Sequence, residues 1–295
     1  MRLDEFDPNS IDVEDQRGGG FSLGGAAGQI GCGSLVVALI GALLFGVNPG
    51  QMLGGGSQQQ EATAPVARQG GTTVSESCTL DAASHEACNA LSSLNKTWQQ
   101  VFARSNLPFH PPKLVFYSQM GQSGCGVAQS TMGPFYCPDD QGIYLDTDFF
   151  RQLDRQLGAG GQFARDYVIA HEYGHHVQNL VGLSDQVRRL QEENPAAANS
   201  LSVRLELQAD CYAGVWAAKN RDRLEPGDME SGLNAAHQIG DDTLMREAGH
   251  RPVEAMFTHG TSAQRMKWLR TGLDTANEDA CDTFADLHRS AGAAP

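Results

Sequence analysis

Two histidines one helical turn apart constrain this chain more than any other feature. The sequence from His171 to His175 reads H-E-x-x-H, and residues 162–170 before it lack proline and glycine and place apolar side chains at helical spacing. At a spacing of four, both imidazoles leave the same face of a helix and can bind one metal ion, with Glu172 beside it. The pattern therefore predicts a buried helix that carries two metal ligands and a base.

The chemistry of this motif suits one Zn²⁺ ion with an open coordination position. Bound Zn²⁺ lowers the pKa of a water molecule from 15.7 toward about 7, and Glu172 is placed to accept that water's proton. Gly174 lies inside the same predicted helix, where glycine is less stable than alanine by about 1 kcal/mol. We therefore expect a neighbouring backbone or a substrate to approach closely at Gly174.

A second predicted helix, residues 202–216, supplies the third ligand. The longer metzincin pattern is absent, because Gln178 and Val181 stand where glycine and histidine would be required. Glu206 and Asp210 share one stripe of the second helix. We expect Glu206 to bind the metal, and Asp210 to accept a hydrogen bond from the far nitrogen of a ligating histidine, which fixes its tautomer.

Other roles for these residues are open at this point. Glu206 and Asp210 can instead form an ordinary solvated helix face, which is the commoner position of carboxylates. The alternative third ligands are His237, His250 and His259. The stripe that holds Glu206 continues with small residues, which we expect to let this helix pack closely against the motif helix: Ala213, Gly214 and Ala217.

Two residues are candidates to stabilise the oxyanion that forms when water attacks a peptide carbonyl. His259 lies just before Thr261-x-x-Gln264, a capping box that opens another predicted helix, so its position would be rigid. Tyr212 is the second candidate. Simple packing is the alternative role for both side chains.

Periodicity predicts a mixed α+β domain with a small sheet. A helix is expected around Leu80 to Ser105, and short strands at residues 112–117 and 142–146. The glycine-rich stretch at residues 121–126 lacks the lysine and hydroxyl residue of a phosphate loop, so it predicts a turn held by a disulfide. No G-x-S-x-G sequence occurs, which leaves a serine hydrolase without support.

The N-terminal quarter differs in composition from the rest. Residues 1–28 are acidic and then glycine-rich, and predict a disordered tail. Residues 29–48 form an uncharged apolar run that is long enough for a single transmembrane helix. Residues 49–76 have the composition of a flexible linker. The folded domain is then expected to occupy residues 77–290.

Charge and cysteine content suggest where the domain lies. Arg2 and Arg17 precede the apolar run, which favours a cytoplasmic N-terminus and an extracytoplasmic domain at the cytoplasmic membrane. A net charge of −14 without a basic patch argues against nucleic acid as a partner. Six cysteines follow the apolar run without C-x-x-C spacing, which suits disulfides in an oxidising compartment, and fifteen pairings are open to them: Cys78, Cys88, Cys125, Cys137, Cys211 and Cys281.

Several separate motifs together resemble those of the bacterial neutral zinc metallopeptidases. The motifs are residues 133–138 (G-P-F-Y-C-P), 171–179 (H-E-x-x-H-H-V-Q-N), 205–211 (L-E-L-Q-A-D-C) and 257–260 (F-T-H-G). The resemblance runs from about residue 78 to 285 and includes the glycine-rich arm near the membrane. It implies a zincin-like fold that binds zinc through His171, His175 and Glu206, uses Glu172 as general base and acts on protein or peptide substrates.

The resemblance also bears on the disulfides and on the cleft. Together with loop length, it implies that Cys78 pairs with Cys88, Cys125 with Cys137, and Cys211 with Cys281. In zincin-like folds an edge strand over the cleft holds extended peptide by backbone pairing. Residues 143–146 are our candidate for that strand, and an ordinary place in the sheet core is the alternative.

The sequence thus predicts an α+β zincin-like metallopeptidase, preceded by one transmembrane helix, that hydrolyses peptide bonds with one Zn²⁺ ion. The alternative from another class is a membrane-anchored binding or scaffold protein that uses the fold without turnover. A closed structural zinc site with four ligands is a third possibility. Glu172 argues against both alternatives, because neither needs a base beside the metal.

Overall fold

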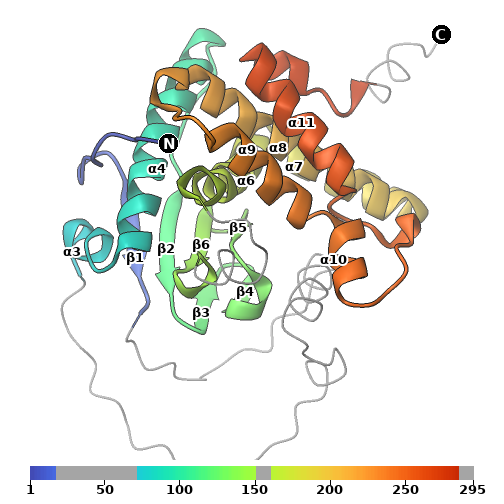
Figure 1. The fold of residues 1–295 in the computed structure, drawn as a ribbon, viewed down its shortest axis with the longest axis horizontal. Helices are drawn as coiled ribbons and strands as arrows, with labels where there is room; N and C mark the ends of the chain where they lie inside the picture. Colours follow the sequence, from blue (N-terminus) through green and yellow to red (C-terminus); the bar gives the residue numbers. More distant parts are fainter. Residues whose placement is uncertain (18–71, 151–160, 286–295) are drawn as a thin grey trace, which may run out of the picture.

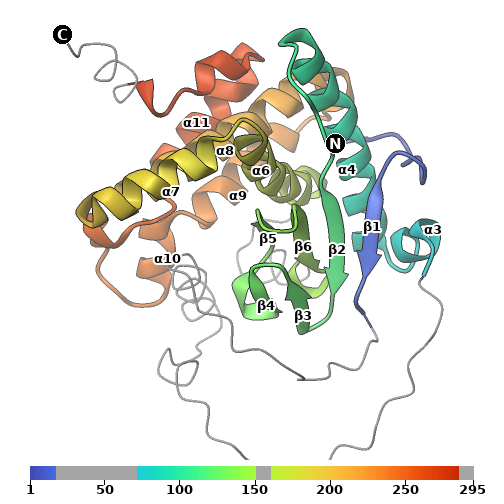
Figure 2. The same cartoon turned by 180° about the vertical axis from the view of Figure 1, so that it is seen from behind.

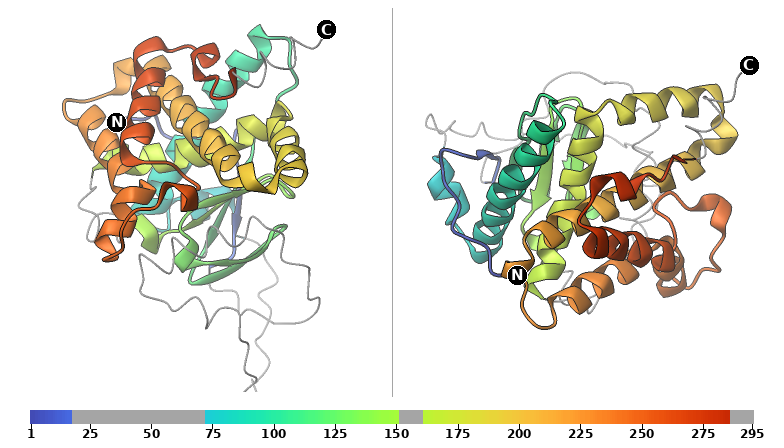
Figure 3. Two further views of the ribbon diagram at one scale, coloured as in Figure 1. Left: turned by 90° about the vertical axis from the view of Figure 1, so that its right-hand side faces the viewer. Right: turned by 90° about the horizontal axis from the view of Figure 1, so that it is seen from above.

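Helices gather on one side of a small β-sheet in this protein (Figures 1 and 3). The computed structural model describes residues 1–17, 72–150 and 161–285. The main core lies between the sheet and the two helices that pack on it, α4 (Ala82–Arg104) and α6 (Gln162–Leu180). The prediction of a mixed α+β domain with a small sheet is confirmed.

The helices follow the predicted periodicities. Asp81 caps α4 by accepting a hydrogen bond from the backbone N–H of Ser84, and α6 contains the whole H-E-x-x-H motif. The other α-helices of the described residues are α3 (Val74–Cys78), α7 (Leu183–Glu193), α8 (Ala198–Lys219), α9 (Asp228–Gln238), α10 (Asp241–Glu247) and α11 (Ser262–Thr275). Short 3-10 turns lie at Ser130–Met132, Pro195–Ala197, Arg221–Arg223, Glu254–Met256 and Glu278–Cys281.

The main sheet has the strand order β1-β2-β6-β5 (Figure 2). Its strands are β1 (Asp12–Asp15), β2 (Lys113–Tyr117), β6 (Gly142–Asp146) and β5 (Phe135–Cys137). β1, β2 and β6 run parallel, whereas β5 is antiparallel to β6. A hairpin of β3 (Met120–Ser123) and β4 (Gly126–Gln129) forms a second sheet.

The predicted strands are present, but the prediction that residues 143–146 form the strand over the cleft is wrong. All five residues of β6 are buried, and the strand lies between β2 and β5 with both of its edges paired. Residues 143–146 therefore belong to the sheet core and cannot accept a further strand. Among the described residues, the strand at the edge of the sheet next to α6 is β5.

Residues 1–17 are part of the folded domain, so the prediction of a disordered tail over residues 1–28 is wrong for them. β1 pairs with β2 in register, with Asp12 opposite Lys113. Met1 is fully buried, and its amine lies 3.0 Å from the Asp228 carboxylate. The acidic composition of residues 1–17 does not indicate a strand, because the partners of this short strand lie about a hundred residues away in the chain.

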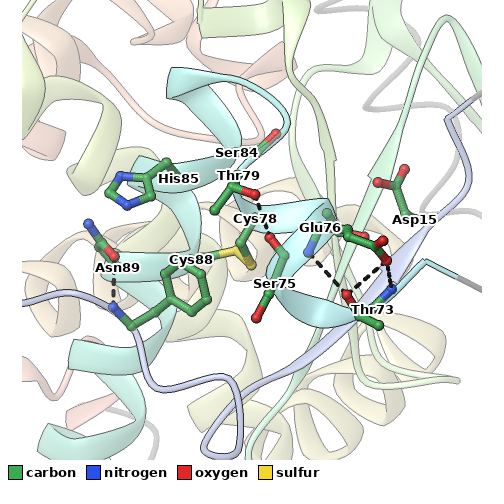
Figure 4. The surroundings of a disulfide bond; sticks show 12 residues. Asp15, Thr73, Ser75, Glu76, Cys78, Thr79, Ser84, His85, Cys88 and Asn89 are labelled. Carbon is green, nitrogen blue, oxygen red and sulfur yellow. Dashed lines mark hydrogen bonds between the residues drawn. A yellow bond between two sulfur atoms is a disulfide. The ribbon is translucent and has the colours of Figure 1, made fainter.

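Arg17 fixes the end of this N-terminal segment. Its guanidinium donates to both oxygens of Asp15 and to the carbonyl of Ser77, and it stacks 4.5 Å from the centre of the Phe116 ring. Near the other end, the backbone N–H of Phe6 donates to the side chain of Asn89 on α4 (Figure 4). The segment is thus joined to the domain along its length.

The expected linker over residues 49–76 is wrong at its C-terminal end. Thr73 and Glu76 form a capping box that opens α3, with hydrogen bonds in both directions (Figure 4). The disulfide between Cys78 and Cys88 then joins α3 to α4. The other two implied pairings, Cys125 with Cys137 and Cys211 with Cys281, are present as well.

The predicted transmembrane helix at residues 29–48 lies outside the described residues. Within residues 1–17, 72–150 and 161–285, no helix has the length and apolar character that a bilayer crossing requires.

Glycines bring three helices into close contact. A Cβ on Gly174 of α6 would lie 2.9 Å from the Cα of Ala209 on α8, as expected for an approaching backbone. A Cβ on Gly214 of α8 would lie 2.2 Å from the carbonyl oxygen of Leu269 on α11. The expectation that Gly214 faces the motif helix is therefore wrong, because this glycine faces α11 instead.

Candidate metal centre

Helices α6 and α8 bring the three predicted ligands together. The Nε2 atom of His171 lies 3.0 Å from Glu206 Oε2, and the Nε2 atom of His175 lies 3.5 Å from Glu206 Oε1. One ligand atom from each of the three residues falls within 4.8 Å of the others, and no second group of this kind occurs in the described ranges. His237, His250 and His259 are thus outside the cluster.

The donor set and its spacing fit zinc. Two imidazoles and a carboxylate are the ligands of many catalytic zinc sites, with metal–ligand distances of about 2.0–2.1 Å. In a tetrahedral site of that size, neighbouring ligand atoms are separated by about 3.3 Å. The distances from Glu206 to the two histidines lie on either side of this value.

Each histidine has a partner that fixes its tautomer. The Nδ1 atom of His171 lies 2.8 Å from Asp210 Oδ1, and Asp210 is fully buried. Burial raises the pKa of Asp210, but the charges of Arg265 and His171 outweigh it and hold the pKa at about 2. The ionised carboxylate can only accept, so Nδ1–H donates and Nε2 is left to face Glu206.

His175 is held in the same way by a neighbour on its own helix. Its Nδ1 lies 2.9 Å from Gln178 Oε1, and the amide nitrogen of Gln178 donates to the carbonyl of Leu205 and to Gln208. The amide orientation therefore makes Gln178 an acceptor toward His175. Nε2 of His175 is again the free nitrogen.

The electrostatics of the cluster favour a cation. Burial lowers the pKa of His171, but the charge of Asp210 and hydrogen bonds to Asp210 and Glu206 raise it to about 10. Burial raises the pKa of Glu206, but the charges of His175 and His259 hold it well below its usual range. A site that stabilises protonated imidazoles this strongly also stabilises a metal ion in their place.

Glu172 lies beside the cluster and is buried, with about 9% of its surface exposed. Burial raises its pKa, and the neighbouring charges of His171 and His175 oppose that effect. Its carboxylate also accepts a hydrogen bond from the backbone N–H of Tyr136 in β5. The Glu172 carboxylate thus faces the edge strand of the sheet.

A series of buried, hydrogen-bonded side chains holds β5 against α6. The hydroxyl of Tyr136 lies 3.1 Å from His176 Nδ1, and His176 Nε2 donates to the carbonyl of His110 at 2.7 Å. Burial lowers the pKa of His176 to about 4, so the ring is neutral. The side chain of Asn179 donates to the same hydroxyl. His176 therefore positions β5 and is no ligand.

His259 lies near the carboxylate of Glu206, on the loop that leads into α11. Its charge is one of the causes that lower the pKa of Glu206. Asp241 holds this loop: its Oδ2 accepts hydrogen bonds from the backbone N–H groups of residues 258, 259 and 260, and its Oδ1 lies 3.2 Å from His259 Nδ1. The other oxyanion candidate, Tyr212, packs edge-on against Trp98.

Four residues around the site were missed from the sequence: Tyr167, Gln178, Asp241 and Arg265. Tyr167 and Arg265 both bind Asp210, as described below. One signal was available for Arg265, because it stands one turn before Leu269 on the face of α11 that carries apolar residues. Asp241 had no such signal, since its partners are backbone groups that follow it by 17 residues or more.

Comparison with known proteins supports the same interpretation. The Escherichia coli (strain K12) protein named "Uncharacterized protein YpfJ" is 42% identical over 285 residues, which cover 93% of this chain and 96% of the relative. The Mycobacterium tuberculosis (strain H37Rv) protein named "Uncharacterized protein Rv2575" is 41% identical over 266 residues, which cover 83% of this chain and 86% of the relative. No solved structure matches the chain.

A family model described as "Putative neutral zinc metallopeptidase" matches residues 5–284. The match includes the N-terminal strand β1, the H-E-x-x-H helix and the helix that carries Glu206. The chain therefore belongs to the neutral zinc metallopeptidase family.

Proposed function

We propose that this protein is a zinc-dependent endopeptidase with a zincin-like fold. The observation that carries the proposal is the cluster of His171, His175 and Glu206, with the buried carboxylate of Glu172 next to it. These three ligands would hold one Zn²⁺ ion and leave a coordination position open. Membership of the metallopeptidase family supports the same assignment.

Bound zinc would supply an activated water and a Lewis acid for the scissile carbonyl. The protein's own groups would then handle the protons. Glu172 accepts the proton of the attacking water and delivers it to the leaving amine. Its pKa is raised by burial, toward the operating pH at which a proton shuttle is most efficient. The backbone N–H of Tyr136 bonds to this carboxylate and opposes the rise of its pKa.

His259 is proposed to stabilise the oxyanion of the tetrahedral intermediate. Support comes from the charge of its ring, which acts on the carboxylate of Glu206 and lowers the pKa of that group. Asp241 and the capping box at Thr261 hold the loop rigidly on both sides of His259. A donor fixed in this way needs little reorganisation when negative charge develops on the substrate.

Substrate backbone is proposed to pair with β5. Within the described residues this strand is the last one of the main sheet, and its residue Tyr136 contacts the proposed base through the backbone. Addition of an extended peptide to that edge would bring its backbone alongside Glu172. The β5 edge replaces residues 143–146, which the sequence had suggested for this role.

The substitution Glu172→Gln tests the proposed reaction. We expect the variant to bind zinc like the wild type and to lose peptidase activity by about 10²- to 10⁴-fold, because the amide cannot accept the proton. The assay is digestion of casein or a peptide library, with and without chelator, alongside metal analysis. Glu192→Gln on the exposed surface of α7 is the matched control and should keep full activity.

The alternative functions give different results in the same assay. A non-catalytic binding or scaffold protein would show no chelator-sensitive digestion in the wild type. A structural zinc site would likewise leave Glu172→Gln indistinguishable from the wild type. Either result would exclude the proposed peptidase.

We further propose that the domain works outside the cytoplasm and is attached to the cytoplasmic membrane. Three disulfides among the described residues support an oxidising compartment. The attachment relies on the apolar composition of residues 29–48. In the described conformation β1 pairs with β2, which lies beyond those residues in the sequence. A single crossing would separate the two strands, so this pairing is incompatible both with a cytoplasmic N-terminus and with one membrane-spanning helix between them. We therefore propose that residues 1–17 lie on the same side of the membrane as the domain.

A cross-link between the paired strands tests this arrangement in cells. Asp12 and Lys113 are register partners, so the variant Asp12→Cys/Lys113→Cys should form a disulfide that mass spectrometry detects in the purified protein. The single variants serve as controls, and the three native disulfides report whether the compartment is oxidising. Native disulfides without the engineered one would contradict the shared compartment.

A further inference from the structure

Arg265 is a buried cation next to the candidate metal centre. Only 3% of its surface is exposed, although arginine is among the residues least often buried. Its guanidinium donates two hydrogen bonds of 2.9 Å to Asp210, from Nε to Oδ2 and from Nη2 to Oδ1. Desolvating a cation and a carboxylate is unfavourable by several kcal/mol per ion, and such pairs are no better for stability than apolar packing. A structural role alone therefore explains Arg265 poorly.

This bidentate pair of hydrogen bonds fixes the plane of the Asp210 carboxylate. Oδ1 then points at Nδ1 of His171, 2.8 Å away, and also accepts from the hydroxyl of Tyr167 at 2.6 Å. The guanidinium reaches further, to the Tyr167 hydroxyl at 3.3 Å and to the carbonyl of Ile239 at 3.2 Å. Arg265 thus joins α11 to α6, to α8 and to the C-terminal end of α9.

Helix α11 is itself held rigidly where Arg265 leaves it. Thr261 caps the helix one turn earlier, in a box with Gln264. Further along, a Cβ on Gly272 would lie 2.0 Å from the carbonyl oxygen of Cys211, so α11 and α8 touch backbone to backbone next to Asp210. This contact fixes the backbone of α11 relative to the backbone of α8, which carries Asp210.

We propose that Arg265 is a positioning residue for the metal centre: through Asp210 it orients the imidazole of His171 toward the ion. The inference rests on the proposed zinc site but not on turnover. The Nη2 atom of Arg265 also lies 3.3 Å from Nδ1 of His171, the ring nitrogen that faces away from the ion. Arg265 thus lies behind His171 and acts on the geometry of the centre and not on substrate.

The test measures zinc affinity by competition with a chromophoric chelator, together with the visible spectrum of the Co²⁺-substituted protein. We expect Arg265→Met to weaken zinc binding by about 10- to 100-fold, the range for disturbing a ligand's hydrogen-bond partner, because Asp210 loses the guanidinium that orients it. The Co²⁺ spectrum should change as well. In the peptidase assay kcat should fall while KM stays near the wild-type value. Arg270→Met, on the exposed face of the same helix, is the matched control and should leave all readouts unchanged.

Two further variants separate positioning from folding. Arg265→Lys keeps the positive charge but cannot form the bidentate pair of hydrogen bonds to Asp210, so it should also weaken zinc binding. The double variant Asp210→Asn/Arg265→Met should lose no more affinity than the weaker-binding of the two single variants, because Arg265 acts through Asp210. Additive losses would overturn that route.

The remaining outcomes are also decisive. If Arg265→Met and Arg265→Lys lower thermal stability but the folded protein keeps wild-type zinc affinity and Co²⁺ spectrum, Arg265 is only structural and the inference fails. If the wild-type protein binds no zinc, both the inference and the proposed function fail. If the wild type binds zinc without peptidase activity, the proposed function fails and the affinity measurements still decide on Arg265.

Discussion

Gly174 offers a quantitative test of how closely the two ligand-bearing helices must approach. In the variant Gly174→Ala, the new Cβ would lie 2.9 Å from the Cα of Ala209 and 3.0 Å from its Cβ and carbonyl oxygen. Ordinary contacts begin at 3.4 Å, so α6 and α8 must move apart by roughly 0.5 Å. His171 and His175 lie on one side of this contact and Glu206 on the other.

A metal site does not absorb a separation of that size. Metal–ligand distances tolerate deviations of about 0.2 Å, so the three ligands can no longer meet one ion at normal distances. We expect zinc affinity to fall by at least about 10-fold. Helix propensity favours alanine by about 1 kcal/mol, while overpacking is unfavourable by about 1–3 kcal/mol. The free energy of unfolding of the metal-free protein should therefore drop by only about 0–2 kcal/mol.

Chelator competition measures the affinity, and urea unfolding of the metal-free protein measures the stability. Gly232→Ala on α9 is the matched control, because its Cβ would lie 2.5 Å from the ring of Phe163, two turns from the motif. That variant should lose stability and keep zinc affinity. If Gly174→Ala binds zinc within about twofold of the wild type, the helices are not held at the distance that the ligands require, and our reasoning about this contact is wrong.

Three further predictions concern the same site and its frame. The pKa of His171 is raised to about 10 and the pKa of His175 is also raised, so protons compete with zinc for both rings, and zinc affinity should increase as pH rises toward about 10. Calorimetry in buffers of different ionisation enthalpy should show that zinc binding releases protons. A pH-independent affinity would contradict this. His259→Ala should lower kcat by about 10²- to 10³-fold with unchanged zinc affinity, and a loss of zinc would instead make His259 part of the metal centre. Replacing Cys211 and Cys281 by alanine removes a disulfide that closes a loop with a sequence separation of 70 residues, and should lower the free energy of unfolding by about 4 kcal/mol in urea titrations. A loss below about 1 kcal/mol would show that helix packing alone holds this region.

The local features of the site could be predicted because they depend on neighbours in sequence. The spacing of His171 and His175 places both rings on one helix face, and the capping box at Thr261 marks the start of α11. The strand at residues 142–146 has the predicted bounds, because short apolar runs between turn residues favour strands wherever they occur.

What the tertiary structure decided depends on contacts that have no local signal. The edge position of β5, the pairing of β1 with β2, and the facing of Gly214 toward α11 arise from segments far apart in the chain. Asp241 and Arg265 are ordinary surface residue types by composition, and only their burial against backbone groups and Asp210 distinguishes them.

The sequence by itself determined the residues of the candidate site: two imidazoles at helical spacing, a carboxylate between them and a second carboxylate on another helix. Periodicity within one element carries that information, because side-chain direction repeats with the backbone. The tertiary structure alone decided which groups hold the ligands in place and which strand lies beside the base. Those relations depend on how helices and strands pack, and packing is set by the whole chain at once.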